Sequence, residues 1–422
     1  MPESYLVIGG SGFLGRYIVE ALLARGDKNV AVFDVVQRHF DVTFYNGDLA
    51  NEVEVGNAIR KSAATCIFHT ATPSPTAINQ NQDIFYKVNV LGTRTIIAAA
   101  AAHGVPKLVY TSSAGNVYNM TDLIGVDERL PIPEQQLDAY NKSKAQAEAL
   151  VLEANGKEGL HTVALRPAGI FGPGDRTALP GIVSVIKNNQ TRIQIGNNNN
   201  LFDWTYVGNV VKAHLLAADK LLDPPLDTTT VLQNYPPSIT LTTGKYTVPT
   251  SFSRPPGPIV GELTPELEQA YWAFKEGRQP KTLTRSKFDP LTPEALDIEP
   301  TYPLQVAGQT FFITNGEPMY FWDFLRAMWK ALGHENPTSR IVIPSSFGLI
   351  LGTMSEWFSR LLGREPGFTR GRVYYCNTHR WFNIEKARRV LGYEPDVGIE
   401  EGIKRTAAWW KEEQVKADNS VH

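Results

Sequence analysis

The chain has 422 residues, which is enough for two lobes but short for three ordinary domains. Its charges nearly balance at a formal net −2, so no electrostatic attraction to nucleic acid is expected. Its two cysteines, Cys66 and Cys376, exclude a disulfide framework, have no metal-ligand spacing and favour a reducing compartment. No window holds 18 uncharged apolar residues, so no membrane-spanning helix is predicted.

Residues 4–222 alternate short apolar strands with helical stretches. The predicted strands are apolar almost throughout, as strands buried on both faces are, and they read "YLVIG", "NVAVFD", "VTFYNGD", "TCIFHTA", "KLVYTSS" and "HTVALRP". Helices are predicted between them at Phe13–Arg25, Glu52–Ser62, Ile84–His103 and Asp138–Asn155. This alternation predicts an α/β fold, with a Rossmann-type doubly wound parallel sheet that carries helices on both faces.

The first predicted strand runs directly into a glycine-rich turn, "VIGGSGFLG". In that turn Gly9 permits a tight bend, Gly12 lets the backbone approach a pyrophosphate, and Gly15 lets the helix pack on the sheet. The start of the helix also offers free N–H groups and a positive dipole end to phosphates. We therefore predict dinucleotide contacts from the residues of this turn, namely Gly9, Ser11, Gly12, Phe13, Leu14 and Gly15.

Acidic residues end the next two strands. Asp34 lies 19 residues past Gly15, where a carboxylate accepts a hydrogen bond from a ribose 2′-OH and repels a 2′-phosphate. NAD is therefore the predicted cofactor, with NADP the alternative because Arg38 is close; Asp34 could otherwise be a surface turn acid. Asp48-Leu49 is predicted beside the adenine, unless Asp48 is simply the N-cap of the following helix.

The fifth strand ends in a hydroxyl cluster, and the helix after it opens with Tyr140-x-x-x-Lys144. Residues at i and i+4 share a helix face, and ligands of doubly wound sheets bind at the carboxyl ends of the strands. Tyr140 is predicted to take the proton of a substrate hydroxyl, with Lys144 lowering its pKa and Ser113 holding the substrate oxygen. The alternative is a buried tyrosine with a surface lysine, as we interpret the second such pair, Tyr271 and Lys275.

Composition changes after Leu222, and half of the 28 prolines fall between Asp223 and Pro303. Proline neither continues a helix nor donates to a strand ladder, so this stretch is either a disordered insertion or an ordered arm over the site. Regular structure resumes near residue 310. Apolar residues then recur at helical spacing in residues 345–362, which predicts either a helix lying on a membrane surface or one packed in the core.

These motifs together resemble the extended short-chain dehydrogenase/reductase family over residues 4–222 and 310–411. Within it the chain is similar to the 3β-hydroxysteroid dehydrogenase branch, above all to the decarboxylating sterol dehydrogenases of fungi. The stretches that carry the resemblance are "GGSGFLG", "HTATP", "NVLGT", "YTSSAG", "PIPEQQLDAYNKSKAQAE", "LRPAGIFGPGD", "DWTYVGNVVKAH" and "GQTFFITNGEPMYFW".

The resemblance implies oxidation of the 3β-hydroxyl of a 4α-carboxysterol or related triterpenoid, followed by loss of the carboxylate as CO₂. It implies that Ser113, Tyr140 and Lys144 are catalytic, and that Thr70, Ala71 and Pro167 also line the NAD. A homodimer or a sterol-demethylation complex is expected, at the cytosolic face of the endoplasmic reticulum membrane through 345–362, or otherwise in the cytoplasm.

Three features of this assignment stay open at the level of sequence. The expected domains are 1–222 for NAD, with 165–222 contributing partly to the substrate lobe, a Pro-rich insertion at 223–309, and a smaller mixed substrate lobe at 310–422. Arg166 and Arg176 are candidates for holding the substrate carboxylate, unless they only stabilise the fold. The rival functions are a 3β-hydroxysteroid dehydrogenase/isomerase, a nucleotide-sugar epimerase and a dinucleotide-sensing regulator.

Overall fold

The computed structural model describes residues 3–74, 83–226, 304–335, 337, 339–362 and 368–419, without the side chains of Arg360 and Asp418. Most of the Pro-rich insertion predicted at 223–309 therefore lies outside the described residues. The same holds for the second Tyr-x-x-x-Lys pair, Tyr271 and Lys275.

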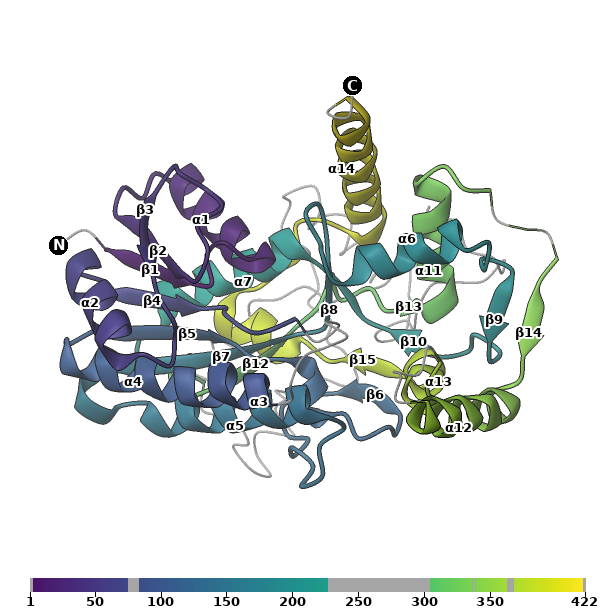
Figure 1. Cartoon of the computed structure of the whole chain (residues 1–422). Coiled ribbons are helices and arrows are strands. Elements are labelled where there is room, and N and C mark those ends of the chain that lie inside the picture. The colour runs from purple at the N-terminus through teal and green to yellow at the C-terminus, as the bar shows by residue number, and fades with distance from the viewer. Residues whose placement is uncertain are drawn as a thin grey trace, which may run out of the picture.

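Seven parallel strands form the larger sheet, in the order β12-β7-β5-β4-β1-β2-β3 (Figure 1). The chain builds outward in one direction from β1 through β2 to β3, and in the other from β4 onward. That reversal is the switch point at which doubly wound sheets bind ligands. The strands are β1 Tyr5–Ile8, β2 Val30–Asp34, β3 Thr43–Asn46, β4 Cys66–His69, β5 Lys107–Thr111, β7 His161–Pro167 and β12 Thr310–Ile313.

Helices cover both faces of this sheet, which confirms the predicted fold class. Successive side chains of a strand point to opposite faces, so Val7 packs in one core with Ile18 and Leu6 in the other with Ile59. Both positions must be apolar, which explains the continuous apolar runs. One face carries α1 Phe13–Arg25 and α7 Val207–Lys220, and the other α2 Glu52–Ser62, α4 Gly92–Ala102 and α5 Ala139–Ala154.

The helix expected at Ile84–His103 is interrupted. A short α3, Asp83–Phe85, leads into a π-helical turn, Tyr86–Leu91, before α4 begins. At this turn Asn89 donates its Nδ2 to the Ser143 hydroxyl of α5 at 2.9 Å. The widened turn thus ties this helix to the one that carries Tyr140, a contact that apolar spacing alone does not predict.

The smaller lobe adjoins the carboxyl ends of the larger sheet (Figure 1). Its main sheet is mixed, in the order β13-β10-β15-β6, and two parallel pairs, β11-β8 and β14-β9, flank it. Its strands are β6 Leu123–Val126, β8 Gly169–Phe171, β9 Ile193–Ile195, β10 Leu201–Phe202, β11 Trp204–Tyr206, β13 Met319–Tyr320, β14 Ile341–Ile343 and β15 Arg380–Phe382. Its helices are α6 Ala178–Lys187, α11 Phe321–Ala331, α12 Ser345–Leu361, α13 Arg370–Asn377 and α14 Ile399–Asn419.

Two strands cross the expected domain bounds. β12, from the region expected to be substrate lobe, is the edge strand of the larger sheet, and β6, from the region expected to bind NAD, belongs to the smaller one. Each sheet therefore includes one strand from the part of the sequence that was expected to form the other lobe.

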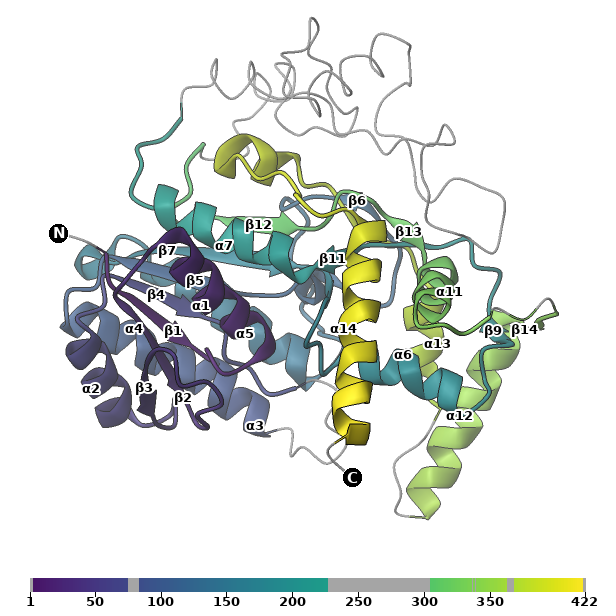
Figure 2. The same ribbon diagram turned by 90° about the horizontal axis from the view of Figure 1, so that it is seen from above.

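Helix α12 lies at the outer edge of the smaller lobe in both views (Figure 2). Its apolar side chains are exposed rather than packed in a core; Met354 is 61 % exposed, Trp357 65 % and Leu361 64 %. Within the part of the chain that the structure describes, no helix has the length and apolar character to cross a membrane.

Candidate active site

The glycine turn after β1 packs directly against the end of β4. Gly9 has φ +85°, and a Cβ added there would lie 2.7 Å from the backbone nitrogen of Ala71. A Cβ on Gly15 would lie 2.2 Å from the carbonyl oxygen of Gly9. Only glycine fits these positions, and the turn presents its backbone at the switch point with the N-terminus of α1. The residues therefore fit the pyrophosphate of a dinucleotide.

Asp34, at the end of β2, lies beside the same turn. Its Oδ2 accepts a hydrogen bond from the Ser11 backbone N–H at 3.0 Å, and Arg38 Nη1 donates to the Ser11 carbonyl at 3.1 Å. A carboxylate and a guanidinium thus adjoin one backbone unit, so the site offers a partner for a ribose hydroxyl and one for a phosphate.

The alternative interpretation of Asp48 as a helix cap is wrong. Asn51 caps α2 with its side chain, whereas Asp48 Oδ2 forms an ion pair with Lys87 at 2.6 Å. Leu49 is buried. Thr70 holds the glycine turn through a hydrogen bond from its hydroxyl to the Ile8 carbonyl at 3.0 Å.

The hydroxyl cluster and α5 meet at the carboxyl end of β5. The Ser113 hydroxyl accepts a hydrogen bond from the Gly115 N–H at 3.0 Å, and it lies near enough to the Tyr140 phenol to favour the phenolate. Phe85 packs edge-on against the Tyr140 ring, with 5.8 Å between the ring centroids. Burial raises the pKa of Tyr140 to about 12, and the neighbouring Ser113 hydroxyl offsets only part of this effect.

Lys144 lies one turn further along α5 and is buried. Its Nζ donates to the carbonyl of Thr111 and lies 4.2 Å from the centroid of the Tyr110 ring. Burial lowers the pKa of Lys144 to about 7, although Glu148 favours the charged form. Burial is thus the largest influence on the pKa of both Tyr140 and Lys144, and the tuning of Tyr140 by Lys144 stays a prediction.

A buried ion pair beneath these residues was not foreseen. Arg166, near the end of β7, donates to both carboxylate oxygens of Glu148, with Nε at 2.9 Å from Oε2. Ser112 donates to the same carboxylate at 2.6 Å, and Asn116 donates to the Ser112 hydroxyl at 3.0 Å. Glu148 continues the i, i+4 series of Tyr140 and Lys144, which is the signal that could have revealed it.

This network decides between the uses considered for Arg166. Its guanidinium forms the buried ion pair with Glu148 and stabilises the fold. We call the group of Tyr140, Lys144, Glu148 and Arg166 the floor of the site. Arg176, the second candidate for a substrate carboxylate, is exposed in the turn before α6. Pro167 ends β7, where it pairs with Ile313 of β12.

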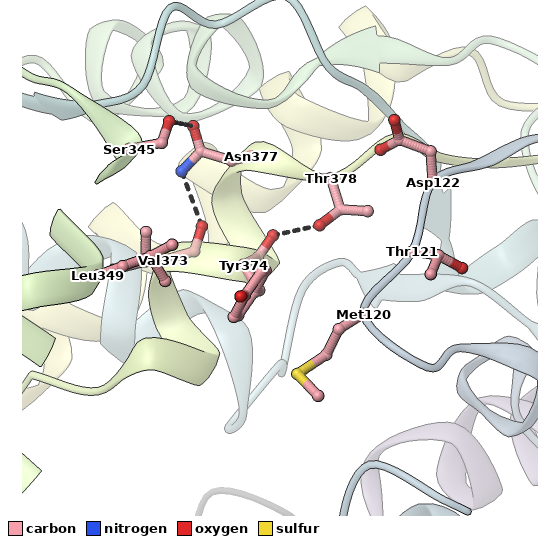
Figure 3. Close-up of a pocket in the computed structure, with 9 residues that line it drawn as sticks. All are labelled: Met120, Thr121, Asp122, Ser345, Leu349, Val373, Tyr374, Asn377 and Thr378. Carbon is pink, nitrogen blue, oxygen red and sulfur yellow. Dashed lines mark hydrogen bonds between the residues drawn. The ribbon is translucent and has the colours of Figure 1, made fainter. Parts of the chain in front are cut away.

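A pocket of about 320 Å³ opens beside the loop that follows Ser113 (Figure 3). Met120 lines it from that loop with a left-handed backbone, φ +71°. Leu349 of α12 and Val373 of α13 line it from the smaller lobe. The pocket thus lies between the loop that follows Ser113 and α12, the helix with the exposed apolar side chains.

Comparison with known proteins places the chain in a family. The model of the 3-beta hydroxysteroid dehydrogenase/isomerase family matches residues 6–236 and 295–344. The chain belongs to this family. It is 40 % identical to the decarboxylating sterol-4-alpha-carboxylate 3-dehydrogenase of Saccharomyces cerevisiae, over 97 % of this chain and 98 % of that protein.

More distant relatives extend the same picture. The chain is 31 % identical to the decarboxylating sterol-4-alpha-carboxylate 3-dehydrogenase of Mus musculus, over 95 % of this chain and 89 % of that protein. A solved short-chain dehydrogenase/reductase superfamily protein of Agrobacterium tumefaciens, with bound NAD, matches with a TM-score of 0.60 at 18 % identity. That match covers 99 % of this chain and 100 % of the other, and it supports the fold alone.

Proposed function

We propose that this member of the 3-beta hydroxysteroid dehydrogenase/isomerase family is an NAD(P)-dependent oxidoreductase of 4-carboxysterols. It oxidises the 3β-hydroxyl and releases the C4 carboxylate as CO₂, giving a 3-ketosterol. The observation that carries the proposal is the meeting of Ser113, Tyr140 and Lys144 at the carboxyl end of β5, beside the glycine turn. Similarity over nearly the whole chain to decarboxylating sterol dehydrogenases supports the substrate class.

The oxidation needs one group that takes a proton from the substrate oxygen. Tyr140 is placed for this role, and Ser113 holds the same oxygen through its hydroxyl. Lys144 is the buried amine one turn away that can favour the phenolate when charged. The glycine turn would hold NAD, which would supply the hydride acceptor for C3. Because burial raises the pKa of Tyr140 to about 12, the phenolate fraction grows with pH, and oxidation is expected to accelerate from neutral to alkaline pH.

Loss of CO₂ follows from the position of the new ketone. With a carbonyl at C3, the C4–carboxylate bond can break and leave its electron pair on the C3 oxygen as an enolate. The Ser113 and Tyr140 hydroxyls, which already hold that oxygen, stabilise its negative charge, and C4 then takes up a proton. The step needs no metal. Among the described residues, no cluster of His, Cys, Asp and Glu could hold one.

A second candidate function is a 3β-hydroxysteroid dehydrogenase/isomerase, which the description of the matching family favours. That enzyme oxidises the same hydroxyl but keeps every carbon. The two functions differ in whether the substrate must carry a carboxylate, so a substrate panel separates them.

The exposed apolar side chains of α12 support contact with a membrane surface, from which a sterol would arrive. We place this contact at the cytosolic face of the endoplasmic reticulum membrane. Arg370 forms an ion pair with Glu356 of α12. The exposed apolar side chains of α12 are therefore the part of the described surface on which the membrane contact is proposed to depend. A homodimer or a sterol-demethylation complex remains part of the proposal.

The test is NADH formation by the purified protein with NAD or NADP and a panel of 3β-hydroxysterols, with and without a 4α-carboxylate. We expect turnover of the carboxylated sterols and strong discrimination against the plain ones. Equal turnover of plain sterols would contradict the decarboxylating function and favour the dehydrogenase/isomerase. A lack of turnover with every sterol would contradict both.

A further inference from the structure

Arg380, the first residue of β15, holds its guanidinium among three aromatic rings. Its Cζ lies 4.1 Å from the centroid of the Tyr118 ring, 4.7 Å from that of Tyr375 and 5.2 Å from that of Phe202. Stacking on ring faces fixes the plane of a guanidinium and leaves its N–H edges free for a planar acceptor.

Among the residues that the structure describes, no carboxylate forms an ion pair with Arg380, and its Nε is buried without an acceptor. The fully buried arginines differ from Arg380, which is partly buried. Arg166 pairs with Glu148, Arg326 with Asp323, and Arg388 with Glu385 and Glu394. A partly buried charge without a counterion is costly, so the lack of a carboxylate partner among the described residues points to an anion that binds at Arg380.

Arg380 contacts the loop that follows Ser113, which we call the catalytic loop. Tyr118 follows the short 3₁₀ turn Ala114–Val117 that begins immediately after Ser113. Its phenol donates to the Thr378 hydroxyl at 3.0 Å, two residues before Arg380. Arg380 also pairs in register with Leu123 of β6, the strand that ends the same loop. The loop from Ser113 therefore carries the aromatic face on which the guanidinium rests.

We propose that Arg380 binds the C4 carboxylate of the substrate and selects carboxylated sterols. This inference rests on the proposed function and assigns its anion-recognition residue. A guanidinium can bind a carboxylate through two parallel N–H···O hydrogen bonds, which fixes orientation as well as supplying energy. Carboxylate and 3β-hydroxyl stand on neighbouring carbons, so an anion held beside the catalytic loop brings the hydroxyl toward Ser113 and Tyr140.

The test compares kcat/KM for two sterols that differ only at C4, one with a 4α-carboxylate and one with a methyl group there. Hydrogen bonds between charged groups contribute roughly 1.5–3 kcal/mol, so Arg380→Gln should lower kcat/KM for the carboxylated sterol about 10- to 100-fold, mainly through KM. Turnover of the methyl sterol should change little. Arg380→Lys keeps the positive charge but lacks the two parallel N–H donors of a guanidinium, so it should lose less of the preference for the carboxylated sterol.

The matched control is Arg370→Gln, which removes an exposed arginine of the same lobe and should leave both substrates unaffected. Retention of the wild-type preference by Arg380→Gln would overturn the inference, as would equal loss on both substrates, which indicates a structural role. If Arg380→Gln does not fold, Arg380→Lys decides by the same comparison. An absence of any carboxylate preference in the wild type would instead contradict the proposed function itself.

Discussion

The floor of the site and the edge of the smaller lobe are built in opposite ways. On the floor, Glu148 and Arg166 form a buried pair, and Lys144 donates to a backbone carbonyl. At the smaller lobe, Arg380 has no carboxylate partner among the described residues, and the apolar side chains of α12 are exposed. The charged groups near the carboxyl end of β5 thus have partners within the described residues, whereas Arg380 and the apolar side of α12 do not.

The largest expected effect is on kcat, when the phenol of Tyr140, the proposed proton acceptor, is removed. Tyr140→Phe should lower kcat by roughly 10²–10⁴-fold, because general base catalysis is lost while the ring remains. NADH binding, followed by fluorescence, should persist. Tyr271→Phe, which alters the second Tyr-x-x-x-Lys pair, is the control. Full activity in Tyr140→Phe with loss in Tyr271→Phe would show that the wrong tyrosine was assigned.

The next effect is a loss of stability when the buried pair is broken. Arg166→Met should lower the free energy of unfolding by about 3–5 kcal/mol, because Glu148 is left buried and charged. The double variant with Glu148→Leu should recover much of this loss. Urea denaturation measures both changes.

Glu153→Gln on the same helix is the control for the buried pair, since the Glu153–Lys157 pair is exposed. It should change the free energy of unfolding by at most about 1 kcal/mol. A cost for Arg166→Met as small as that of the control would mean that Glu148 and Arg166 are not a closed, buried pair.

At the outer edge of the smaller lobe, replacing exposed apolar residues of α12 should weaken membrane contact without unfolding the protein. Trp357 and Leu361 are each more than half exposed, so the double variant Trp357→Gln/Leu361→Gln should lower vesicle binding about tenfold or more. Flotation with phosphatidylcholine vesicles measures the binding, and Val415→Gln on α14 is the exposed control. Unchanged flotation of the α12 variant would remove this helix from the membrane proposal.

A smaller effect is expected on the pH dependence of stability, through the buried amine of Lys144. Burial lowers the pKa of Lys144 from 10.5 to about 7, so the unfolded chain binds more protons between these pH values and stability rises with pH there. Lys144→Met removes this dependence. The variant should melt above the wild type below pH 7 without cofactor, and the difference should shrink as pH rises toward 10.5. A constant difference across that range would contradict a buried amine.

The sequence predicts the larger sheet well because its information is local. Apolar runs such as "YLVIG" and the glycine turn determine strand, turn and helix within a few residues, and α1 and α2 begin and end where expected. The positions of Ser113 and Tyr140 follow from the rule that ligands bind at carboxyl strand ends. The role given to these residues stays a prediction until the variants are measured.

What the sequence does not predict depends on contacts across long distances. β12 joins the larger sheet beside β7 although more than a hundred residues separate them. Arg380 is conspicuous only once Tyr118, Phe202 and Tyr375 surround it, and no spacing pattern links these residues. The pKa values of Tyr140 and Lys144 likewise reflect burial, which the pair's helical spacing does not reveal.

The central claim is that oxidation at C3 leads to loss of carbon at C4. The most direct measurement uses a sterol labelled in its 4α-carboxylate and follows labelled CO₂ and NADH together in one reaction. The account predicts one CO₂ for each NADH, with a 3-ketosterol that lacks the label. NADH formation accompanied by a product that keeps its labelled carboxylate would contradict it.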